Sequence, residues 1–496
     1  MKLHPKIVVI TTPIRPVPTD FPPQGSLSVI SALKRAGYVD THFYNIDIIR
    51  PSYEEAVKHI VKERPDILAI SAVVSTSYAY SKQISLDVKK ALPGTAIILG
   101  GNLGASAEIL LRKTGCDFIA IGEGERTIVD FVRVFEKSPH SRKEYMEVDG
   151  LAFLDDRMNL VVTQYPIPVA ADNIYDIDWK ILEDLDQLKY FNISLNNKNL
   201  DYGVMHRDDP RLKRMRSEGR NYFLVTASKG CVARCTFCHR WDKGIRYIPV
   251  PVLMRRIDNF IRDYNVGVFR FGDENFGTDK RWLSQFLDEI TKRSVLWHVG
   301  GMRVGSLSDE WVDRMRQAGS VSILCGMESG SQRMLDVMEK KTTVEQNHKV
   351  ARWLIEKGVG TGVQVVVGMP GESPQTTEET CQFLGKVASV SADWDPNNIS
   401  VNFAQALPGT PLYETGRRKG LIGQAIDDEE RYLIKISDRD ARDAETTLNF
   451  TDYPRLSLRW WHKKMNNAAR FAYIEKFGVK AYRIMLQNSN YFESSL

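Results

Sequence analysis

Three cysteines, spaced by three and then two residues, form the densest group of reactive side chains in the sequence. Cys231, Cys235 and Cys238 lie within residues 229–239, directly after an apolar strand pattern. Thiolates are soft ligands that suit iron-sulfur clusters and zinc. Three ligands leave one coordination position open, whereas a structural zinc site is normally closed by a fourth Cys or His. The spacing therefore indicates a metal centre with an open position.

His239 adjoins the last cysteine and is the candidate fourth ligand of a zinc site, the alternative interpretation. A three-two spacing that ends in Cys-His matches none of the usual zinc patterns. The remaining cysteines are far apart in the sequence, each within an apolar or helical pattern, so we expect buried structural thiols at Cys116, Cys325 and Cys381. Six cysteines in 496 residues do not indicate a disulfide framework.

Six apolar strand patterns, with helical patterns between them, occupy the second half of the chain and predict a partial (β/α)6 barrel. They are Tyr222–Ala227, Val268–Phe271, Leu296–Val299, Val321–Leu324, Gly362–Val367 and Ile399–Phe403. Acidic segments follow two of these strands, at Gly272-Asp273-Glu274 and at Gly326-Met327-Glu328-Ser329-Gly330. A lone loop carboxylate usually caps the next helix, but these segments share the carboxyl edge of the strands, where ligands gather.

The first 140 residues alternate short strands with amphipathic helices and predict a doubly wound parallel sheet, which makes the chain an α/β protein. The strands expected are Lys6–Thr11, His42–Ile46, Ile67–Ser71, Ala96–Leu99 and Phe118–Ile121. The dinucleotide fingerprint and the Walker P-loop are absent. Small and polar residues follow the last three strands instead, namely Ser71, Ser75, Thr76, Gly100, Gly101, Asn102 and the run Gly122-Glu123-Gly124-Glu125.

The cysteine segment, with aromatic Phe237 before its last cysteine, resembles the radical S-adenosylmethionine superfamily. That resemblance implies a [4Fe-4S] cluster on the three cysteines, S-adenosylmethionine on the open iron, and a 5'-deoxyadenosyl radical made by reductive cleavage. It also implies an electron donor such as flavodoxin or ferredoxin. The residues that would contact S-adenosylmethionine are Phe237, Gly272, Asp273, Glu274, Arg303, Glu328 and Ser329, with Arg303 after the third barrel strand as partner of the carboxylate.

The front domain resembles the cobalamin-binding domain of the cobalamin-dependent branch of that superfamily. The resemblance implies a Rossmann-like fold whose cobalamin contacts come from Ser71, Ser75, Thr76, Gly100, Gly101, Asn102, Gly122, Glu123, Gly124 and Glu125. Asp40-Thr41-His42 begins like the motif that supplies the lower cobalt ligand in other cobalamin enzymes. His42 opens the second strand rather than following the first, so we expect it to be an ordinary strand residue and cobalamin to be bound without a histidine ligand.

The expected organisation is a cobalamin-binding domain at 1–140, a linker or cap at 141–219, a radical S-adenosylmethionine barrel at 220–415 and a small helical region at 416–496. The charge of +5 is mild for this length and does not indicate a nucleic-acid partner. With no transmembrane or signal segment, we expect a cytoplasmic protein. Trp394, Trp460 and Trp461 are candidates for core positions or for a pocket lining.

The favoured function is a cobalamin-dependent methyltransferase. It would transfer a methyl group from methylcobalamin to an unactivated carbon of a small-molecule or natural-product substrate, after the radical removes a hydrogen. The alternative is a cyclase, ring-contraction or carbon-carbon coupling enzyme with the same cofactors. A transfer-RNA methylthiotransferase would need a second cysteine set in the front domain, where residues 1–150 contain only Cys116. A cobalamin-binding sensor would leave the three cysteines without a role.

Overall fold

The computed structural model describes residues 4–197, 200, 203–206, 208–239, 244–439 and 441–488. The chain forms two compact units. The amino-terminal unit comprises the described residues of 1–190, 239–241 and 406–440, and the barrel unit comprises those of 191–238, 242–405 and 441–496. No helix of these residues is both long and apolar enough to cross a membrane.

The amino-terminal unit is built on a seven-stranded sheet in the order β2-β1-β3-β4-β5-β6-β7. Five parallel strands occupy the predicted positions: β1 Ile7–Thr11, β2 Thr41–Tyr44, β3 Ile67–Ser71, β4 Ala96–Gly100 and β5 Phe118–Ala120. Two antiparallel strands that were not predicted extend the edge, β6 Leu151–Leu154 and β7 Leu160–Val162. The predicted doubly wound sheet is confirmed, with this hairpin added within the stretch expected to be a linker.

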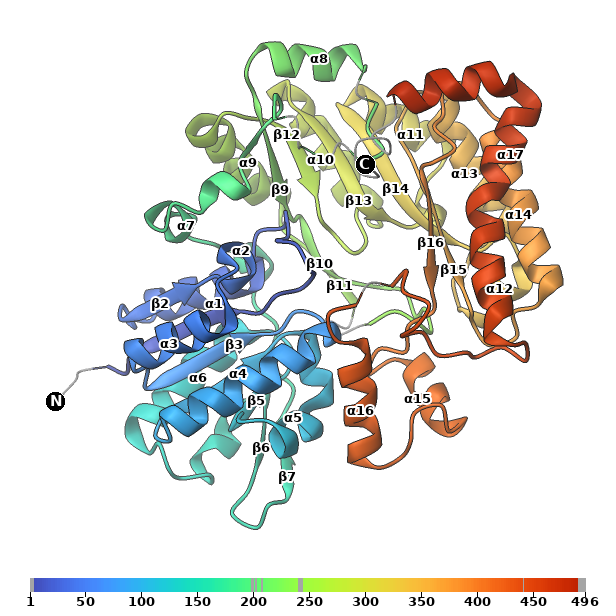
Figure 1. Ribbon diagram of the computed structural model, residues 1–496. Helices are drawn as coiled ribbons and strands as arrows, with labels where there is room; N and C mark the ends of the chain where they lie inside the picture. The colour runs from blue at the N-terminus through green and yellow to red at the C-terminus, as the bar shows by residue number, and fades with distance from the viewer. Residues whose placement is uncertain are drawn as a thin grey trace. The chain divides into compact units, whose positions relative to one another are not determined.

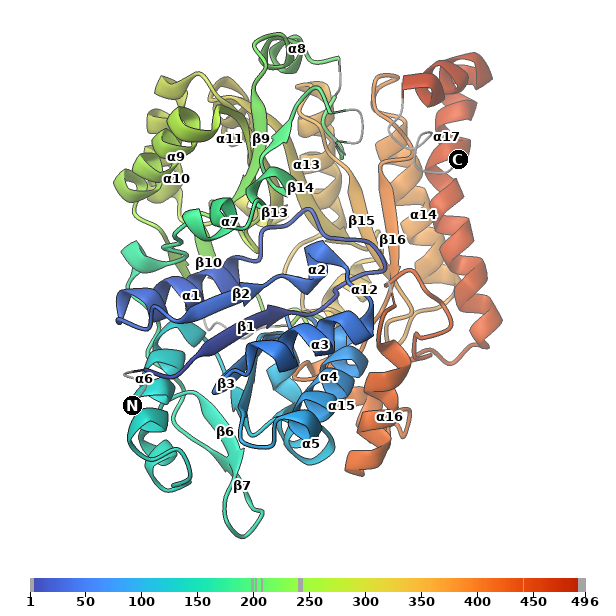
Figure 2. The same cartoon turned by 60° about the vertical axis from the view of Figure 1, so that its left-hand side comes forward.

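Nine helices of the described residues belong to this unit, and Figure 1 draws the first of them in blue. They are α1 Gln24–Arg35, α2 Ile46–Ile49, α3 Tyr53–Glu63, α4 Tyr78–Ala91, α5 Ala107–Lys113, α6 Gly124–Lys137, α7 Lys180–Asp184, α15 Pro411–Arg418 and α16 Ile426–Ile436. α1 packs beside α6, as Figure 2 shows. The start of α3 is fixed by a capping box, in which Ser52 and Glu55 satisfy each other's backbone N–H groups.

The barrel unit holds a second seven-stranded sheet in the order β16-β15-β14-β13-β12-β9-β8. Six strands are parallel, as predicted: β9 Asn221–Val225, β12 Val266–Phe271, β13 Leu296–Met302, β14 Ser320–Glu328, β15 Val363–Val367 and β16 Ile399–Phe403. The two-residue β8, Ile193–Ser194, joins antiparallel to β9. The sheet stays open between β16 and β8, which confirms the partial barrel.

The helices of the barrel unit follow its strands. They are α8 Pro210–Ser217, α9 Val250–Tyr264, α10 Lys280–Ile290, α11 Asp309–Gln317, α12 Gln332–Val337, α13 Val344–Glu356, α14 Pro374–Ala388 and α17 Arg455–Asn488. α17 lies along α14 and also contacts β16, in the red and orange part of Figure 1. Trp394 and Trp461 are buried in this unit, whereas Trp460 is exposed.

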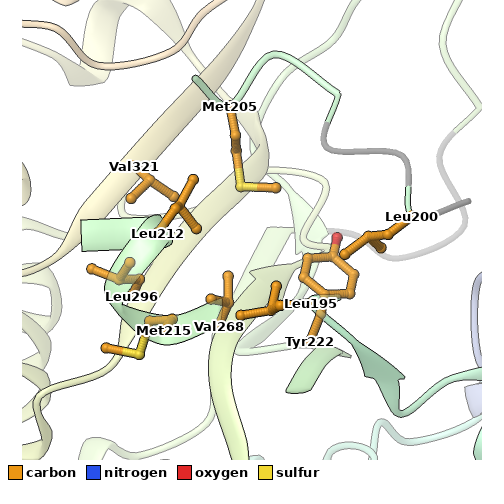
Figure 3. Packing of buried hydrophobic residues seen from close by; sticks show 9 residues of the cluster. All are labelled: Leu195, Leu200, Met205, Leu212, Met215, Tyr222, Val268, Leu296 and Val321. Atoms are coloured by element: carbon orange, nitrogen blue, oxygen red, sulfur yellow. The ribbon is translucent and has the colours of Figure 1, made fainter. Parts of the chain in front are cut away.

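A cluster of buried side chains closes the amino-terminal end of the half-barrel (Figure 3). Tyr222, Val268, Leu296 and Val321 come from near the starts of four neighbouring strands. The preceding chain packs against them with Leu195, Leu200, Met205 and, from α8, Leu212 and Met215. The half-barrel therefore has a sealed floor, and its carboxyl edge is left for ligands.

The predicted domain boundaries at residues 140, 219 and 415 stay predictions. The two compact units combine the segments differently, because β8 and α8 complete the barrel unit whereas α15 and α16 pack in the amino-terminal unit. The chain therefore enters the amino-terminal unit again long after it has left it.

Candidate functional site

The cysteine segment forms a loop closed by a short antiparallel ribbon in the barrel unit. β10, Ser228–Cys231, pairs with β11, Gly244–Tyr247, so that Cys231 lies opposite Gly244. Cys235 is buried, Cys231 is half-buried and Cys238 is exposed, and none of these three described residues is in a disulfide. The described part of the loop thus offers three thiols within eight residues.

The loop is attached to the end of α12. The backbone N–H of Thr236 donates to the carbonyl of Met338 at 3.0 Å, and the Thr236 hydroxyl donates to the carbonyl of Val337 at 3.2 Å. These bonds fix the loop beside the chain that follows β14, although 101 residues separate Thr236 from Val337.

The groups that shift the pKa of the Cys238 thiol show which side chains lie near it. Although the residue is exposed, desolvation of its sulfur raises the pKa of the thiol to about 11, with further contributions from Cys235, Glu274, Cys231 and Glu328. The three thiols and the two predicted carboxylates therefore lie within electrostatic reach of one another.

Glu328, the last residue of β14, has a strained backbone with φ of 62°. A non-glycine residue in this left-handed region costs about 1–2 kcal/mol. Its side chain folds back over Gly326, where a Cβ atom would lie 2.2 Å from the Glu328 Oε1 atom. Asn347 holds the same turn by donating from Nδ2 to the Met327 carbonyl at 2.9 Å.

Lys340 pairs with Glu328 in a nearly buried position, and its Nζ atom donates to Glu328 Oε1 at 2.7 Å. Burial alone would lower the pKa of Lys340, but the charge of Glu328, the hydrogen bond to it and the Cys235 thiol hold that pKa above its usual value. Arg303 lies next to this pair and donates to the Lys340 carbonyl at 2.7 Å.

Asp273 and Ser329, two of the predicted contacts of S-adenosylmethionine, are buried and hydrogen-bonded within the protein. Asp273 is buried; it accepts from the Ala227 N–H at 3.1 Å and from the Ser228 hydroxyl, and burial raises its pKa to about 7. Ser329 is buried and shares a 3.0 Å hydrogen bond with Thr380 on α14. We therefore interpret Asp273 as an anchor for β10, and Ser329 as an anchor for the turn after β14.

The remaining predicted contacts are more accessible. Glu274 and Gly272 are exposed, while Phe237 and Arg303 are half-buried. Gly301 allows β13 to approach the acidic turn, because a Cβ atom there would lie 2.6 Å from the Asp273 carbonyl oxygen and 3.2 Å from that of Glu274. Glu274 is therefore the acidic residue of this segment that is placed for a ligand.

Sequence reasoning missed Lys340, Asn347 and Gly301. Lys340 stands next to Lys341 in a polar stretch, and such a pattern predicts that both lysines are exposed to solvent. Its role depends on a contact with Glu328, which no local pattern reveals. Gly301 was detectable only as half of the pair Gly300-Gly301 at the end of a strand.

The thiols fit an iron-sulfur cluster by their chemistry. Among the described residues, no three His, Cys, Asp or Glu side chains are arranged to hold a single metal ion. A cubane cluster is larger than an ion and takes thiolate ligands that stand farther apart. His239 is hydrogen-bonded to the backbone of Pro408, and burial lowers the pKa of its imidazole. His239 thus has a protein partner, whereas the zinc alternative requires it to be a metal ligand.

In the amino-terminal unit, neighbouring strands end in small residues at one edge of the sheet. Thr11 of β1 lies opposite Ser71 of β3, and Ser71 lies opposite Gly100 of β4. Gly101 has φ of 98°, and a Cβ atom there would lie 2.4 Å from the Ala72 carbonyl oxygen. Gly101 thus lets the chain after β4 pass close to the chain after β3, and it is itself exposed, so this edge of small residues is compatible with the expected cobalamin site.

Short helical turns flank this edge. Ser75 and Thr76 lie in the turn Ser75–Ser77 after β3, and Asn102 begins the turn Asn102–Ser106 after β4. The Thr76 carbonyl accepts from the Asp438 N–H at 2.9 Å. Among the described residues, the buried Ser106 hydroxyl has no hydrogen-bond partner, so a polar group of a ligand would satisfy it.

The predicted run from Gly122 to Glu125 is used for packing. Glu123 accepts from the Val169 N–H at 2.7 Å, and Glu125 accepts from the Ser28 hydroxyl at 2.8 Å. A Cβ atom on Gly122 would lie 2.9 Å from the Tyr165 ring, and one on Gly124 would lie 3.2 Å from Val29. The structure therefore brings Ser71, Gly100 and Gly101 together as a candidate site. The four residues of the run 122–125 instead contact other parts of the protein.

Other residues singled out in the sequence have structural positions. His42 lies in edge strand β2, as predicted, and pairs with Asp40 at 2.7 Å. Cys116, Cys325 and Cys381 are buried free thiols, which confirms the prediction. Burial raises the pKa of Cys116 and Cys325 to about 12 and that of Cys381 to about 11, so none is a ready thiolate.

Comparison with known families identifies both units. The model of the Radical SAM superfamily matches residues 225–384, and that of the B12 binding domain matches residues 10–132. This chain has a radical S-adenosylmethionine domain and a B12-binding domain, and it is an enzyme. Such a pair of domains implies a [4Fe-4S] cluster, S-adenosylmethionine and cobalamin as cofactors, as predicted.

Proteins with similar sequences are named for different activities. It is 27% identical over 403 residues to an anaerobic magnesium-protoporphyrin IX monomethyl ester cyclase of Cereibacter sphaeroides, over 79% of this chain but 60% of that relative's length. It is 22% identical over 379 residues to an uncharacterised methyltransferase of Pyrococcus horikoshii, over 75% of this chain and 73% of the relative.

Among solved structures, the radical S-adenosylmethionine methyltransferase TsrM from Kitasatospora setae, with cobalamin and a [4Fe-4S] cluster bound, has a similar fold. The TM-score is 0.62 at 15% identity, over 84% of this chain and 75% of that one. At this identity the likeness concerns the fold alone. This chain therefore shares an architecture with a cobalamin-containing methyltransferase. The likeness does not by itself assign a reaction.

Proposed function

We propose that the enzyme is a cobalamin-dependent methyltransferase that acts on an unactivated carbon of a small molecule. The observation that carries this proposal is the grouping of Cys231, Cys235 and Cys238 with Glu274 and Glu328, in a chain that also has a B12-binding domain. When bound, the cluster with S-adenosylmethionine supplies the hydrogen-abstracting 5'-deoxyadenosyl radical, and cobalamin supplies the methyl group.

The chain's own residues would bind and orient these groups. The three cysteines would hold the cluster, and exposed Glu274 would accept the ammonium group of S-adenosylmethionine. Arg303 would pair with its carboxylate. Glu328, held by Lys340, would accept from a ligand hydroxyl. The apolar floor beneath them would limit the entry of water through the amino-terminal end of the half-barrel.

Reconstitution under anaerobic conditions tests the proposal. The protein is loaded with iron, sulfide and cobalamin, then incubated with trideuteromethyl-labelled S-adenosylmethionine, a reductant and a small-molecule extract. We expect 5'-deoxyadenosine, S-adenosylhomocysteine and one product in which a trideuteromethyl group replaces a hydrogen. Absence of both nucleosides from fully loaded protein would contradict the proposal.

Paired cysteine variants provide the control. Cys235→Ala is expected to lose the visible absorption of the cluster and all 5'-deoxyadenosine. Cys381→Ala removes a buried thiol of the same unit outside the loop, so it is expected to keep both.

A cyclase is the second candidate, because a relative at 27% identity is named an anaerobic magnesium-protoporphyrin IX monomethyl ester cyclase. The same incubation separates the two reactions. A cyclase would give 5'-deoxyadenosine without S-adenosylhomocysteine, together with an unlabelled product that has lost hydrogen.

A further inference from the structure

Beside the carboxylate site, the sheet of the half-barrel continues from β14 into β15 and β16. Gly326 of β14 is the strand partner of Gln364 on β15, which in turn is the partner of Ser400 on β16. Such partners lie about 5 Å apart and present their side chains to the same face of the sheet. A Cβ atom on Gly326 would meet the Glu328 carboxylate and the Lys340 ammonium group, so Gln364 lies on the face that carries this ion pair. We call it the inner face.

The other face of β15 and β16 is covered by a helix. His462 of α17 stacks on Phe403 of β16, with ring centroids 4.7 Å apart, and α17 also contacts β15. On β15, Val365 and Val367 are buried on the same side as Phe403. Because side chains alternate along a strand, Gln364 points away from the helix and into the half-barrel.

Gln364 offers a carboxamide that the protein does not use for its own packing. It is exposed within β15, a strand whose four other residues are valine. Within the part of the chain that the structure describes, its side chain forms no hydrogen bond. A carboxamide carries a donor and an acceptor side by side. It can therefore form two hydrogen bonds with one ligand group that also has both.

The inner face around this carboxamide is polar without being charged. Ser400 and Asn402 of β16 are half-buried there, and Asn402 Nδ2 donates to Ser400 Oγ at 3.2 Å. Val366 of β15 is half-buried on the same face and adds apolar surface. Neither strand contains a charged residue, and the adjoining Glu328 and Lys340 pair with each other. A charged ligand group would be left unpaired here, which is costly, whereas an uncharged polar group needs only hydrogen bonds.

We propose that the inner face of β15 and β16 binds the substrate, and that the substrate carries an uncharged amide group. The Gln364 side chain donates to the carbonyl of this amide and accepts from its N–H, while Val366 contacts the apolar part beside it. The substrate then lies next to Glu328, in the site where the proposed reaction needs it. That the ligand is the substrate rests on the proposed function; the preference for an uncharged amide does not.

A titration followed by saturation-transfer NMR tests the preference. The reconstituted protein is loaded with S-adenosylmethionine and kept without reductant, so that no turnover occurs. The probes share one ring: cyclohexanecarboxamide, the anion cyclohexanecarboxylate, the cation cyclohexylmethylamine, and methyl cyclohexanecarboxylate, which accepts hydrogen bonds but donates none. We expect the carboxamide to bind with a Kd of about 10 mM or tighter, at least about fivefold more tightly than the others. Equal binding of the four probes, or no saturable binding of the carboxamide, would overturn the proposal.

Variants of Gln364 locate the contact. Gln364→Leu keeps the bulk and removes the hydrogen bonds, so we expect the carboxamide probe to bind about three- to tenfold more weakly. Gln364→Glu replaces the donor by a charge and should make cyclohexylmethylamine the tightest probe, a reversal that a merely damaged fold would not produce. The matched control Gln375→Leu removes an exposed glutamine on α14 and should leave every Kd unchanged. If the control acts as strongly as Gln364→Leu, or if Gln364→Glu still prefers the carboxamide, the inferred contact is wrong.

S-adenosylmethionine is the other ligand that could occupy this face. Equilibrium dialysis of reconstituted Gln364→Leu should give a Kd for S-adenosylmethionine within about twofold of that of the natural protein. A loss of about tenfold or more would assign Gln364 to S-adenosylmethionine and overturn the proposal. Failure of methyl transfer in a protein that keeps its preference for the carboxamide would instead contradict the proposed function alone.

Discussion

Lys340 and Glu328 form an ion pair at 2.7 Å with both side chains nearly buried. The pair joins the last residue of β14 to the chain after α12, which also receives the cysteine loop through Thr236. One contact therefore links the strained carboxylate to the segment that holds the thiols in position.

Replacing Lys340 by Met leaves Glu328 as a buried carboxylate without its cation. Breaking such a pair from one side costs about 3–5 kcal/mol. We expect Lys340→Met to lower the free energy of unfolding of the barrel unit by this amount in a denaturant titration. Lys341→Met, at the exposed neighbouring position, should change it by less than about 0.5 kcal/mol. Equal effects of the two variants on the free energy of unfolding would contradict a stabilising role of the ion pair between Lys340 and Glu328.

Gly326→Ala places a methyl group where the Glu328 carboxylate lies, 2.2 Å from Oε1 and 3.0 Å from Lys340 Nζ. The carboxylate must move, so we expect weaker binding of S-adenosylmethionine, by about tenfold or more, measured by equilibrium dialysis of the reconstituted protein. Gly305→Ala has no atom within 4 Å of the added methyl group and is the matched control. Unchanged affinity in Gly326→Ala would show that the position of Glu328 does not matter for this ligand.

Glu372 gives the barrel unit a pH dependence. Burial raises the pKa of its carboxyl to about 7 from the ordinary 4.5, although the N–H groups of Gly368 and Met369 oppose the shift. Between these pH values the folded state keeps a proton that the unfolded state has released, so stability falls as pH rises from about 4.5 to 7.

Glu372→Gln cannot titrate. Its stability relative to the natural protein should therefore rise by about 3 kcal/mol across that interval and then stay level, as measured by unfolding at a series of pH values. A constant difference between Glu372→Gln and the natural protein from pH 4.5 to 7 would contradict the assignment.

Leu212→Ala opens the floor of the half-barrel, where Leu212 is fully buried against the strands (Figure 3). A buried Leu→Ala change costs about 2–5 kcal/mol through lost burial and the cavity left behind. We expect the midpoint of denaturant unfolding to fall accordingly, while Ile484→Ala, on the exposed side of α17, should have little effect. A midpoint unchanged in Leu212→Ala would mean that the floor is dispensable.

The parallel strands and the cysteine loop were predictable because their signals are local. Apolar runs of five or six residues between turn signals identify a buried strand, and the spacing of Cys231, Cys235 and Cys238 carries chemistry by itself. The hairpin of β6 and β7 was not found, since it lies in a polar stretch of the sequence and no residue of β7 is buried. Its turn depends on Asp155, which accepts from the Asn159 N–H at 2.8 Å.

The candidate site was predictable in outline and not in its details. The acidic segments could be placed at strand ends, but which oxygen faces inward depends on contacts across the fold. Asp273 turns to Ala227 and Ser228, 46 and 45 residues away, while its neighbour Glu274 faces outward. The ion pair of Lys340 and the exposure of Trp460 likewise follow from tertiary packing, which periodicity does not encode.

α16 completes the amino-terminal unit from far along the chain. Its Glu430 accepts from the fully buried Tyr78 at 2.8 Å and pairs with Lys82, both on α4, while Asp427 pairs with Lys113 on α5. On the ribosome, the first sheet emerges early, yet Tyr78 has no partner until Glu430 has been synthesised. The amino-terminal unit is thus synthesised first, but it receives its last two helices only after all the strands of the barrel unit have been made.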